Sequence, residues 1–204
     1  MCATPSRSPH PEDGGMLFGR PQDETREVIS RRSWQLTVMN SPDPLEPRPV
    51  CDSQAEMSEL VLPNDANPLV ALLGGRLMHW IDLAGAMAAH RHARSYTVTA
   101  SVDHIDFLVP VRVGSLVVLR SSVNRAFRTS MEVGVKVWVE DYIRDTRQHV
   151  ASAHLTFVAV DGKGGRVLVP PVIPETEEQK RRYEDAGRRR ELRRAELERR
   201  KSVT

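Results

Sequence analysis

One long helical pattern of small apolar residues, between Gly74 and Arg94, constrains the fold of this chain more than any other feature. Its apolar positions recur at the spacings of a single face of an α-helix. They are Leu77, Met78, Ile81, Ala84, Gly85 and Ala88. Because most of these side chains are small, we expect another element to pack very close to this face. A loop rich in turn-forming proline, asparagine and aspartate, residues 63–68, precedes the helix.

Alternating apolar and polar residues predict one strand before this helix and four strands after it. The first strand covers residues 56–62, and the later ones cover 96–108, 115–127, 129–141 and 149–161. Short connections between the later segments favour antiparallel neighbours. One antiparallel sheet with one apolar helix predicts a two-layer α+β domain.

Composition divides the chain into three parts. Residues 1–52 are rich in proline, serine, glycine and charge, which predicts a disordered tail because little apolar surface can be buried there. Within this part, the segment SWQLTVM at 33–39 is β-like. We expect it to have no structural role, with an added edge strand or a partner contact as the alternatives. Residues 53–173 hold nearly all the apolar patterning and predict the folded domain, and residues 174–204 predict a basic helix.

Nothing in the sequence predicts membrane insertion or a metal centre. No apolar run reaches the roughly eighteen residues of a transmembrane helix, and the first ten residues lack the apolar region of a signal peptide. The two cysteines, Cys2 and Cys51, do not make a disulfide framework, so we expect a cytoplasmic protein. His90 and His92 would face different sides of a helix, and no cysteine or carboxylate cluster completes a metal site.

Asp82 is the residue of the helix that most needs an explanation. It lies between Met78 and Gly85 on the helical net, at the margin of the apolar stripe. A carboxylate there loses contact with water, and partly buried carboxylates are common at active sites. The alternative is an aspartate at the helix edge that pairs with a nearby arginine or caps another element.

The segments around Asp82 resemble those of a known family. The loop and helix follow the pattern N-x-x-G-x-x-x-GG-x-x-x-x-x-x-D, except that Val70 stands at the first glycine and Ala71 at a position that is often polar. The segments VTASVD…F…PVRVG and RTSMEV accompany this pattern. Together, residues 53–176 resemble the acyl-CoA thioesterases of the hotdog fold. The resemblance implies an α+β hotdog fold, with an antiparallel sheet wrapped around one long central helix. It also implies homodimers that assemble as trimers of dimers, with active sites at the dimer seam.

The resemblance also implies a hydrolase that converts acyl-CoA to a free fatty acid and coenzyme A. Asn67 and Asp82 match the family's catalytic pair, which comes from two different subunits. Asp82 would act as a general base on water or attack the thioester directly. Backbone N–H groups after Gly74 and Gly75 would stabilise the oxyanion, while Asn67 would hold the water or the carbonyl. Coenzyme A is part of the substrate and product, and we expect no other cofactor.

Four further residues are candidates for substrate binding. Arg128, Thr129 and Ser130 begin a strand at the position where the family lines the coenzyme A site, although an ordinary polar turn explains them as well. Asp103 is polar within an apolar strand and is a candidate to orient Asn67 or the ligand.

Two alternatives to the hydrolase stay open. One is a non-catalytic acyl-CoA binder or sensor, which Val70 and Ala71 favour. The other is a hotdog hydratase or dehydratase, whose Asp/His pair would need His79 beside Asp82. No G-x-S-x-G, P-loop or dinucleotide-binding motif is present.

The C-terminal part holds eleven basic and five acidic residues between Lys180 and Lys201. A solvated helix with ion pairs four residues apart explains this composition. Binding of anions, such as the phosphates of coenzyme A, is the alternative, and nucleic acid is less favoured because no aromatic stacking set accompanies the charge.

Overall fold

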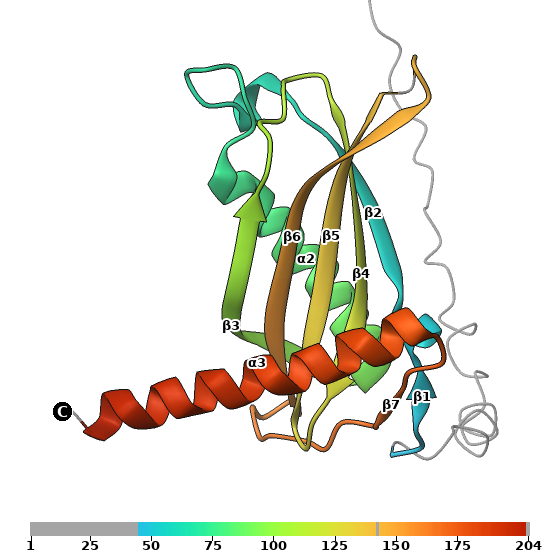
Figure 1. Cartoon of the computed structure of the whole chain (residues 1–204), viewed down its shortest axis with the longest axis vertical. Coiled ribbons are helices and arrows are strands. Elements are labelled where there is room, and N and C mark those ends of the chain that lie inside the picture. The colour runs from blue at the N-terminus through green and yellow to red at the C-terminus, as the bar shows by residue number, and fades with distance from the viewer. Residues whose placement is uncertain (1–44, 142, 203–204) are drawn as a thin grey trace, which may run out of the picture. The chain divides into compact units, whose positions relative to one another are not determined.

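The computed structural model describes residues 45–141 and 143–202 and shows a five-stranded antiparallel sheet (Figure 1). The strand order is β2-β4-β5-β6-β3. The strands are β2 (Ala55–Leu60), β3 (Tyr96–Phe107), β4 (Leu116–Ala126), β5 (Ser130–Asp141) and β6 (Thr146–Val160). They coincide closely with the five segments that alternation predicts. Strands β2 and β3 are the two edges of the sheet.

The long helix, α2 (Gly74–Ala93), packs on one face of this sheet. Its buried stripe includes Ile81, Ala84 and Ala88, which together with inward residues of the strands make the core. A Cβ atom added to Gly85 would lie 3.0 Å from Cε2 of Phe157 on β6, which confirms the expected close packing. Met78 differs from the prediction because 46% of it is exposed. It lies at the margin of the stripe, beyond the part that the sheet covers.

A second long helix, α3 (Glu177–Ser202), crosses the opposite face of the sheet (Figure 1). Along β5, Met131 and Val133 are buried in the core on the α2 side, whereas Glu132 between them contacts α3. Arg189 of α3 contacts both carboxylate oxygens of Glu132, with its Nη2 2.7 Å from Oε1. The sheet is therefore covered by a helix on each face.

The folded unit begins before the predicted boundary at residue 53. The short strand β1 (Arg48–Pro49) pairs in parallel with β7 (Val172–Ile173). The 3₁₀ turn η1 (Val50–Ser53) follows, and its Val50 is 3% exposed within the core. Sequence reasoning assigned these residues to the tail because prolines interrupt their pattern. The β-like segment at 33–39 lies outside the described residues, so its role stays a prediction.

Candidate active site

Asp82 lies in the third turn of α2 and is half-buried against the edge strand β3. Its Oδ1 accepts a hydrogen bond of 2.6 Å from Oγ1 of Thr99 on β3. Sequence reasoning missed Thr99, although its place in the VTASVD segment, next to the helix in the chain, was a usable signal. His79 is exposed, and no contact between it and Asp82 is recorded in the part of the chain that the structure describes. The pairing with histidine that a hydratase would need is therefore not seen.

Asn67 organises the loop that leads into α2. The 3₁₀ turn η2 (Pro63–Asp65) begins this loop. The side-chain Oδ1 of Asn67 accepts hydrogen bonds from the backbone N–H groups of Leu69, at 2.9 Å, and Ala71, at 3.2 Å. This is the Asx-type turn that asparagine commonly forms. The Nδ2 group of Asn67 makes no hydrogen bond to another residue within 45–141 and 143–202. It is therefore the part of the amide that can donate a hydrogen bond to a ligand.

Val70 occupies the left-handed region of backbone space, with a φ of 59°. Its N–H donates to the carbonyl oxygen of Asn67 at 2.9 Å, which closes the turn. A β-branched residue is strained in this conformation, whereas glycine adopts it freely. The family pattern carries glycine at this position, and the structure supplies the physical reason. The loop keeps the tight turn even though Val70 replaces the glycine.

The start of α2 leaves backbone donors uncapped. The residue before the helix is Leu73, whose apolar side chain makes no capping hydrogen bond. Gly74 and Gly75 are exposed, and no side chain within 4 Å would contact a Cβ at Gly75. The first N–H groups of a helix carry partial positive charge and bind anionic groups. This end of α2 can therefore receive a developing oxyanion.

An ion pair fixes this loop to the helix. Nε of Arg76 lies 2.6 Å from Oδ1 of the buried Asp65, and Oδ2 of Asp65 accepts from the backbone N–H of Leu62 at 3.1 Å. The hydrogen bond from Arg76, followed by that from Leu62, lowers the pKa of Asp65 below its usual value. Sequence reasoning did not select Asp65 or Arg76, because they lie eleven positions apart across an irregular loop.

The other predicted residues are not brought to Asp82 within one chain. Ser130 pairs with Val158, which also pairs with Val98 near the start of β3, so residues 128–130 lie at the end of the sheet where α2 finishes. Asp103 is an ion-pair partner of Arg193 on α3. Within one chain it therefore lies on the α3 side, away from Asn67, and its role toward a ligand stays a prediction.

A β-bulge explains the position of Asp103. The pairing register of β3 with β6 shifts between Thr99 and Ser101. Strict alternation would put Thr99, Ser101 and Asp103 on one face, but an extra residue turns the following side chains to the other face. Thr99 therefore contacts α2, whereas Ser101 and Asp103 bond to each other on the α3 side.

The surface beside Asp82 is open and apolar. On α2, Met78 is 46% exposed and Leu83 is 42% exposed. On the free edge of β3, Val102 and Phe107 are each about half exposed. A carboxylate held by a hydroxyl, next to an apolar surface and an unpaired strand edge, suits water activation beside an apolar ligand. Among the described residues, no group of three potential metal ligands occurs, and no helix is long and apolar enough to cross a membrane.

Comparisons with known proteins identify similar chains. The family model described as the thioesterase superfamily matches residues 71–143. A Bacillus subtilis protein described as an uncharacterized acyl-CoA thioester hydrolase is 44% identical over 63% of this chain and 74% of its own length. Two mouse relatives, named acyl-coenzyme A thioesterase 11 and acetyl-coenzyme A thioesterase, are longer, and the match spans 24% and 26% of their lengths.

Solved structures are similar over most of the described chain. An acyl-CoA hydrolase from Staphylococcus aureus, in complex with butyryl coenzyme A and coenzyme A, shares 35% identity with a TM-score of 0.72, covering 77% of this chain and 96% of that one. Structures of that enzyme also exist with an aspartate, an asparagine or a threonine changed to alanine. An apo-hexameric acyl-CoA thioesterase shares 40% identity with a TM-score of 0.71, covering 74% of this chain and 97% of that one.

Proposed function

The chain belongs to the acyl-CoA thioester hydrolases of the thioesterase superfamily, and from this premise we propose that it hydrolyses acyl-CoA to a free carboxylic acid and coenzyme A. The observation that carries the proposal is the hydrogen bond from Thr99 to Asp82. The altered asparagine and aspartate of the S. aureus enzyme are as far apart in sequence as Asn67 and Asp82, and its aspartate and threonine as far apart as Asp82 and Thr99. This shared spacing supports a role for all three residues.

Asp82 is the proposed base. It takes a proton from a water molecule whose oxygen attacks the thioester carbonyl carbon; the carbon–sulfur bond then breaks, and the thiolate of coenzyme A leaves and is protonated. Direct attack by Asp82, giving a short-lived anhydride that water hydrolyses, balances equally well. In either case the hydroxyl of Thr99 fixes one carboxylate oxygen and leaves the other for the reactants. Thr99 thus acts as a positioning residue for Asp82.

The developing oxyanion is proposed to bind at the start of α2. Backbone N–H groups at Gly74 and Gly75 supply donors and the positive end of the helix dipole. Because neither residue carries a side chain, the thioester can approach the backbone closely. The Nδ2 group of Asn67 is the proposed second donor, since its Oδ1 is already used in the turn. The exposed Met78, four residues before Asp82, offers an apolar surface to the acyl chain.

Asn67 is proposed to act on the Asp82 of a second subunit. Within one chain, Asn67 lies in the loop before α2 and Asp82 lies two turns into the helix, and no contact between them is recorded for the described residues. The exposed apolar side chains on the free edge of β3 support pairing of two copies along this edge. Related enzymes are hexameric, which supports a trimer of such dimers.

The proposed reaction needs water, a carboxylate and backbone donors, and hence no metal or prosthetic group. The cytoplasmic location also stays a proposal.

Replacement of Asp82 tests the proposal. Asp82→Asn keeps the size of the side chain and removes the base, so kcat should fall about 10²–10⁴-fold, measured as thiol release from acyl-CoA. Thr99→Val should lower kcat while Thr99→Ser, which keeps the hydroxyl, restores it. Asp106→Asn, at an exposed acid of the same strand, is the matched control and should leave kcat unchanged. Full activity of Asp82→Asn would assign Asp82 a structural role only.

Mixed oligomers test the partnership between subunits. Inactive Asn67→Ala and Asp82→Asn chains, refolded together, should regain activity because one of the two active sites of a mixed dimer then holds both functional residues. Equal inactivity of the mixture would place the pair within one chain. If the unaltered protein binds coenzyme A but releases no thiol from any acyl chain length, it is a non-catalytic acyl-CoA binder.

A further inference from the structure

Asp65 is a buried carboxylate in an irregular loop, and the proposed mechanism gives it no task. Only 3% of it is exposed, and it lies two positions before Asn67. Both of its oxygens are used: Oδ1 accepts a hydrogen bond from Nε of Arg76 at 2.6 Å, and Oδ2 accepts from the backbone N–H of Leu62 at 3.1 Å. A carboxylate taken out of water is costly unless such partners compensate it. Since an apolar residue would be easier to bury here, the pair points to a need for fixed geometry.

Asp65 joins the loop to the first turn of α2 at two points. Its backbone carbonyl oxygen accepts from the N–H of Leu73, the residue before the helix, at 2.9 Å. Its side chain holds Arg76, the third residue of the helix. Asn67 follows in the loop, and its backbone N–H donates to the carbonyl oxygen of Ala71 at 2.7 Å. The place of Asn67 relative to the start of the helix is thus set through Asp65.

Arg76 is itself fixed from the side of the core. Its guanidinium carbon lies 6.0 Å from the ring centroid of Trp80, one turn further along α2. Trp80 is 5% exposed and belongs to the core. A cation at this distance from an aromatic ring is attracted to it. A continuous set of contacts therefore runs from the core through Arg76 and Asp65 to the loop that carries Asn67.

The proposed reaction requires donors from two parts of one chain to converge on the reacting group. They are the N–H groups at the start of α2 and Nδ2 of Asn67, which lies on the loop. A displacement of about 1 Å in such a group can lower a rate about 10²-fold. The tip of the loop has few contacts of its own to hold it, since Leu69 is 85% exposed and Val70 is 63% exposed. A tie between the loop and the helix is therefore needed to keep these donors together.

We propose that Asp65 and Arg76 are positioning residues for the hydrolysis, and that their ion pair holds Asn67 in place beside the first turn of α2. This role rests on the proposed function, because it assigns the pair to the same site. Neither side chain needs to touch the substrate. The hydrogen bond from Arg76 lowers the pKa of Asp65, so the carboxylate stays charged and the ion pair persists at neutral pH.

Replacement of either partner tests this role through kcat. Asp65→Asn keeps the size of the side chain, but an amide has one acceptor oxygen, so either Arg76 or Leu62 would face its NH₂ group. Arg76→Gln leaves the carboxylate of Asp65 without its cation. We expect each variant to lower kcat for thiol release about 10–100-fold, with KM little changed. The double variant should lose no more than the worse single variant, because the two partners of one ion pair act as a unit.

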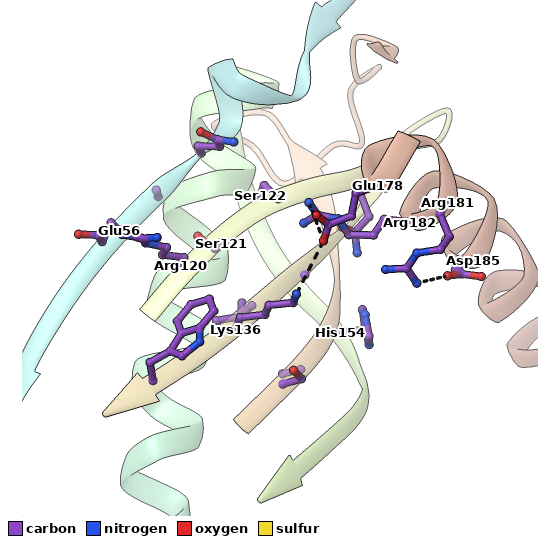
Figure 2. Close-up of a pocket in the computed structure, with 18 of the residues that line it drawn as sticks. Glu56, Arg120, Ser121, Ser122, Lys136, His154, Glu178, Arg181, Arg182 and Asp185 are labelled. Carbon is purple, nitrogen blue, oxygen red and sulfur yellow. Dashed lines mark hydrogen bonds and ion pairs between the residues drawn. The ribbon is translucent and has the colours of Figure 1, made fainter. Parts of the chain in front are cut away.

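Glu140→Gln is the matched control, since it also replaces a carboxylate that pairs with an arginine. Glu140 of β5 pairs with Arg147 of β6. It lies outside the candidate active site and outside the cationic cleft between α3 and the sheet, which Figure 2 shows. The pair of Glu178 with Lys136 lines that cleft, where a change of charge would also alter the attraction of an anionic substrate, so it is a poorer control. Glu140→Gln should leave kcat unchanged.

Mixed oligomers separate positioning from a general folding defect. Asp65 belongs to the same loop as Asn67, so an Asp65→Asn chain should recover activity with an Asp82→Asn chain but not with an Asn67→Ala chain. A chain that merely folds poorly would recover with neither. The mixture of Asn67→Ala with Asp82→Asn is the positive control. Recovery by the mixture of Asp65→Asn with Asn67→Ala would overturn the proposal.

Amide hydrogen exchange gives a readout that does not depend on hydrolysis. Residues 66–72 should exchange faster in Asp65→Asn than in the unaltered chain, and Glu140→Gln should leave their exchange unchanged. Full kcat of Asp65→Asn in an active protein, or unchanged exchange of the loop, would overturn the role of the ion pair. An unaltered chain that releases no thiol would instead refute the proposed function.

Discussion

Replacing Val70 by glycine should stabilise the protein, which is the opposite of the usual effect of a glycine. Val70 has a φ of 59°, and the left-handed region costs a residue with a side chain roughly 1–2 kcal/mol. Glycine removes this cost but loses about 0.5–1 kcal/mol of additional chain entropy on folding. Val70 is 63% exposed, so little apolar burial is lost. The expected net gain in the free energy of unfolding is about 0.5–1 kcal/mol.

A gain of that size is measurable by thermal unfolding at fixed protein concentration. For a domain of this length, about 1 kcal/mol corresponds to a rise of roughly 2–4 °C in Tm. Val70→Asn should give part of the gain because asparagine tolerates the left-handed region, and Val70→Ala should give almost none. Thioesterase activity should be retained, because the turn at Asn67 is kept.

The neighbouring residue provides the control. Leu69 is 85% exposed and has an ordinary negative φ, so Leu69→Gly adds the entropy cost without relieving strain. It should therefore lower the free energy of unfolding by about 0.5–1 kcal/mol. If Val70→Gly and Leu69→Gly destabilise the protein equally, the turn at Val70 stores no strain and the reasoning fails.

Three further predictions concern packing and charge. Arg189→Met leaves Glu132 buried without its ion-pair partner and should cost about 3 kcal/mol in urea unfolding, whereas Arg188→Met, at an exposed pair, should cost less than about 1 kcal/mol. Gly85→Ala should cost about 1–3 kcal/mol in thermal unfolding, since the new methyl group would meet an aromatic ring at 3.0 Å. Burial lowers the pKa of His92 in the folded chain, so as pH falls the unfolded chain takes up a proton at a higher pH than the folded chain does. The free energy of unfolding should therefore fall as pH drops below about 6.5. His92→Gln should make the free energy of unfolding less dependent on pH in that range.

Local pattern was sufficient to predict the main sheet and the helix on its inner face. Alternation along residues 129–141 matches β5, because a strand buried on one face needs an apolar side chain at every second position. The small residues around Gly85 predicted a close neighbour, which is the ring of Phe157. Asp82 was selected because partial burial of a carboxylate beside an apolar stripe costs free energy, so such a residue needs an explanation. These features depend on residues within one element, so the sequence contains them.

Contacts between distant elements could not be predicted in the same way. The bulge after Thr99 leaves Thr99 on Asp82 and turns Asp103 toward Arg193, although strict alternation puts both residues on one face. The docking of α3 depends on Glu132 of β5, whose partner Arg189 lies 57 positions further along the chain.

The sequence by itself thus determined which segments are strands and helices, and which face of each is apolar, because those properties follow from the repeat of the backbone. The tertiary structure decided which polar side chains meet, because one extra residue in a strand exchanges its two faces and because the partner of a buried charge can lie anywhere along the chain.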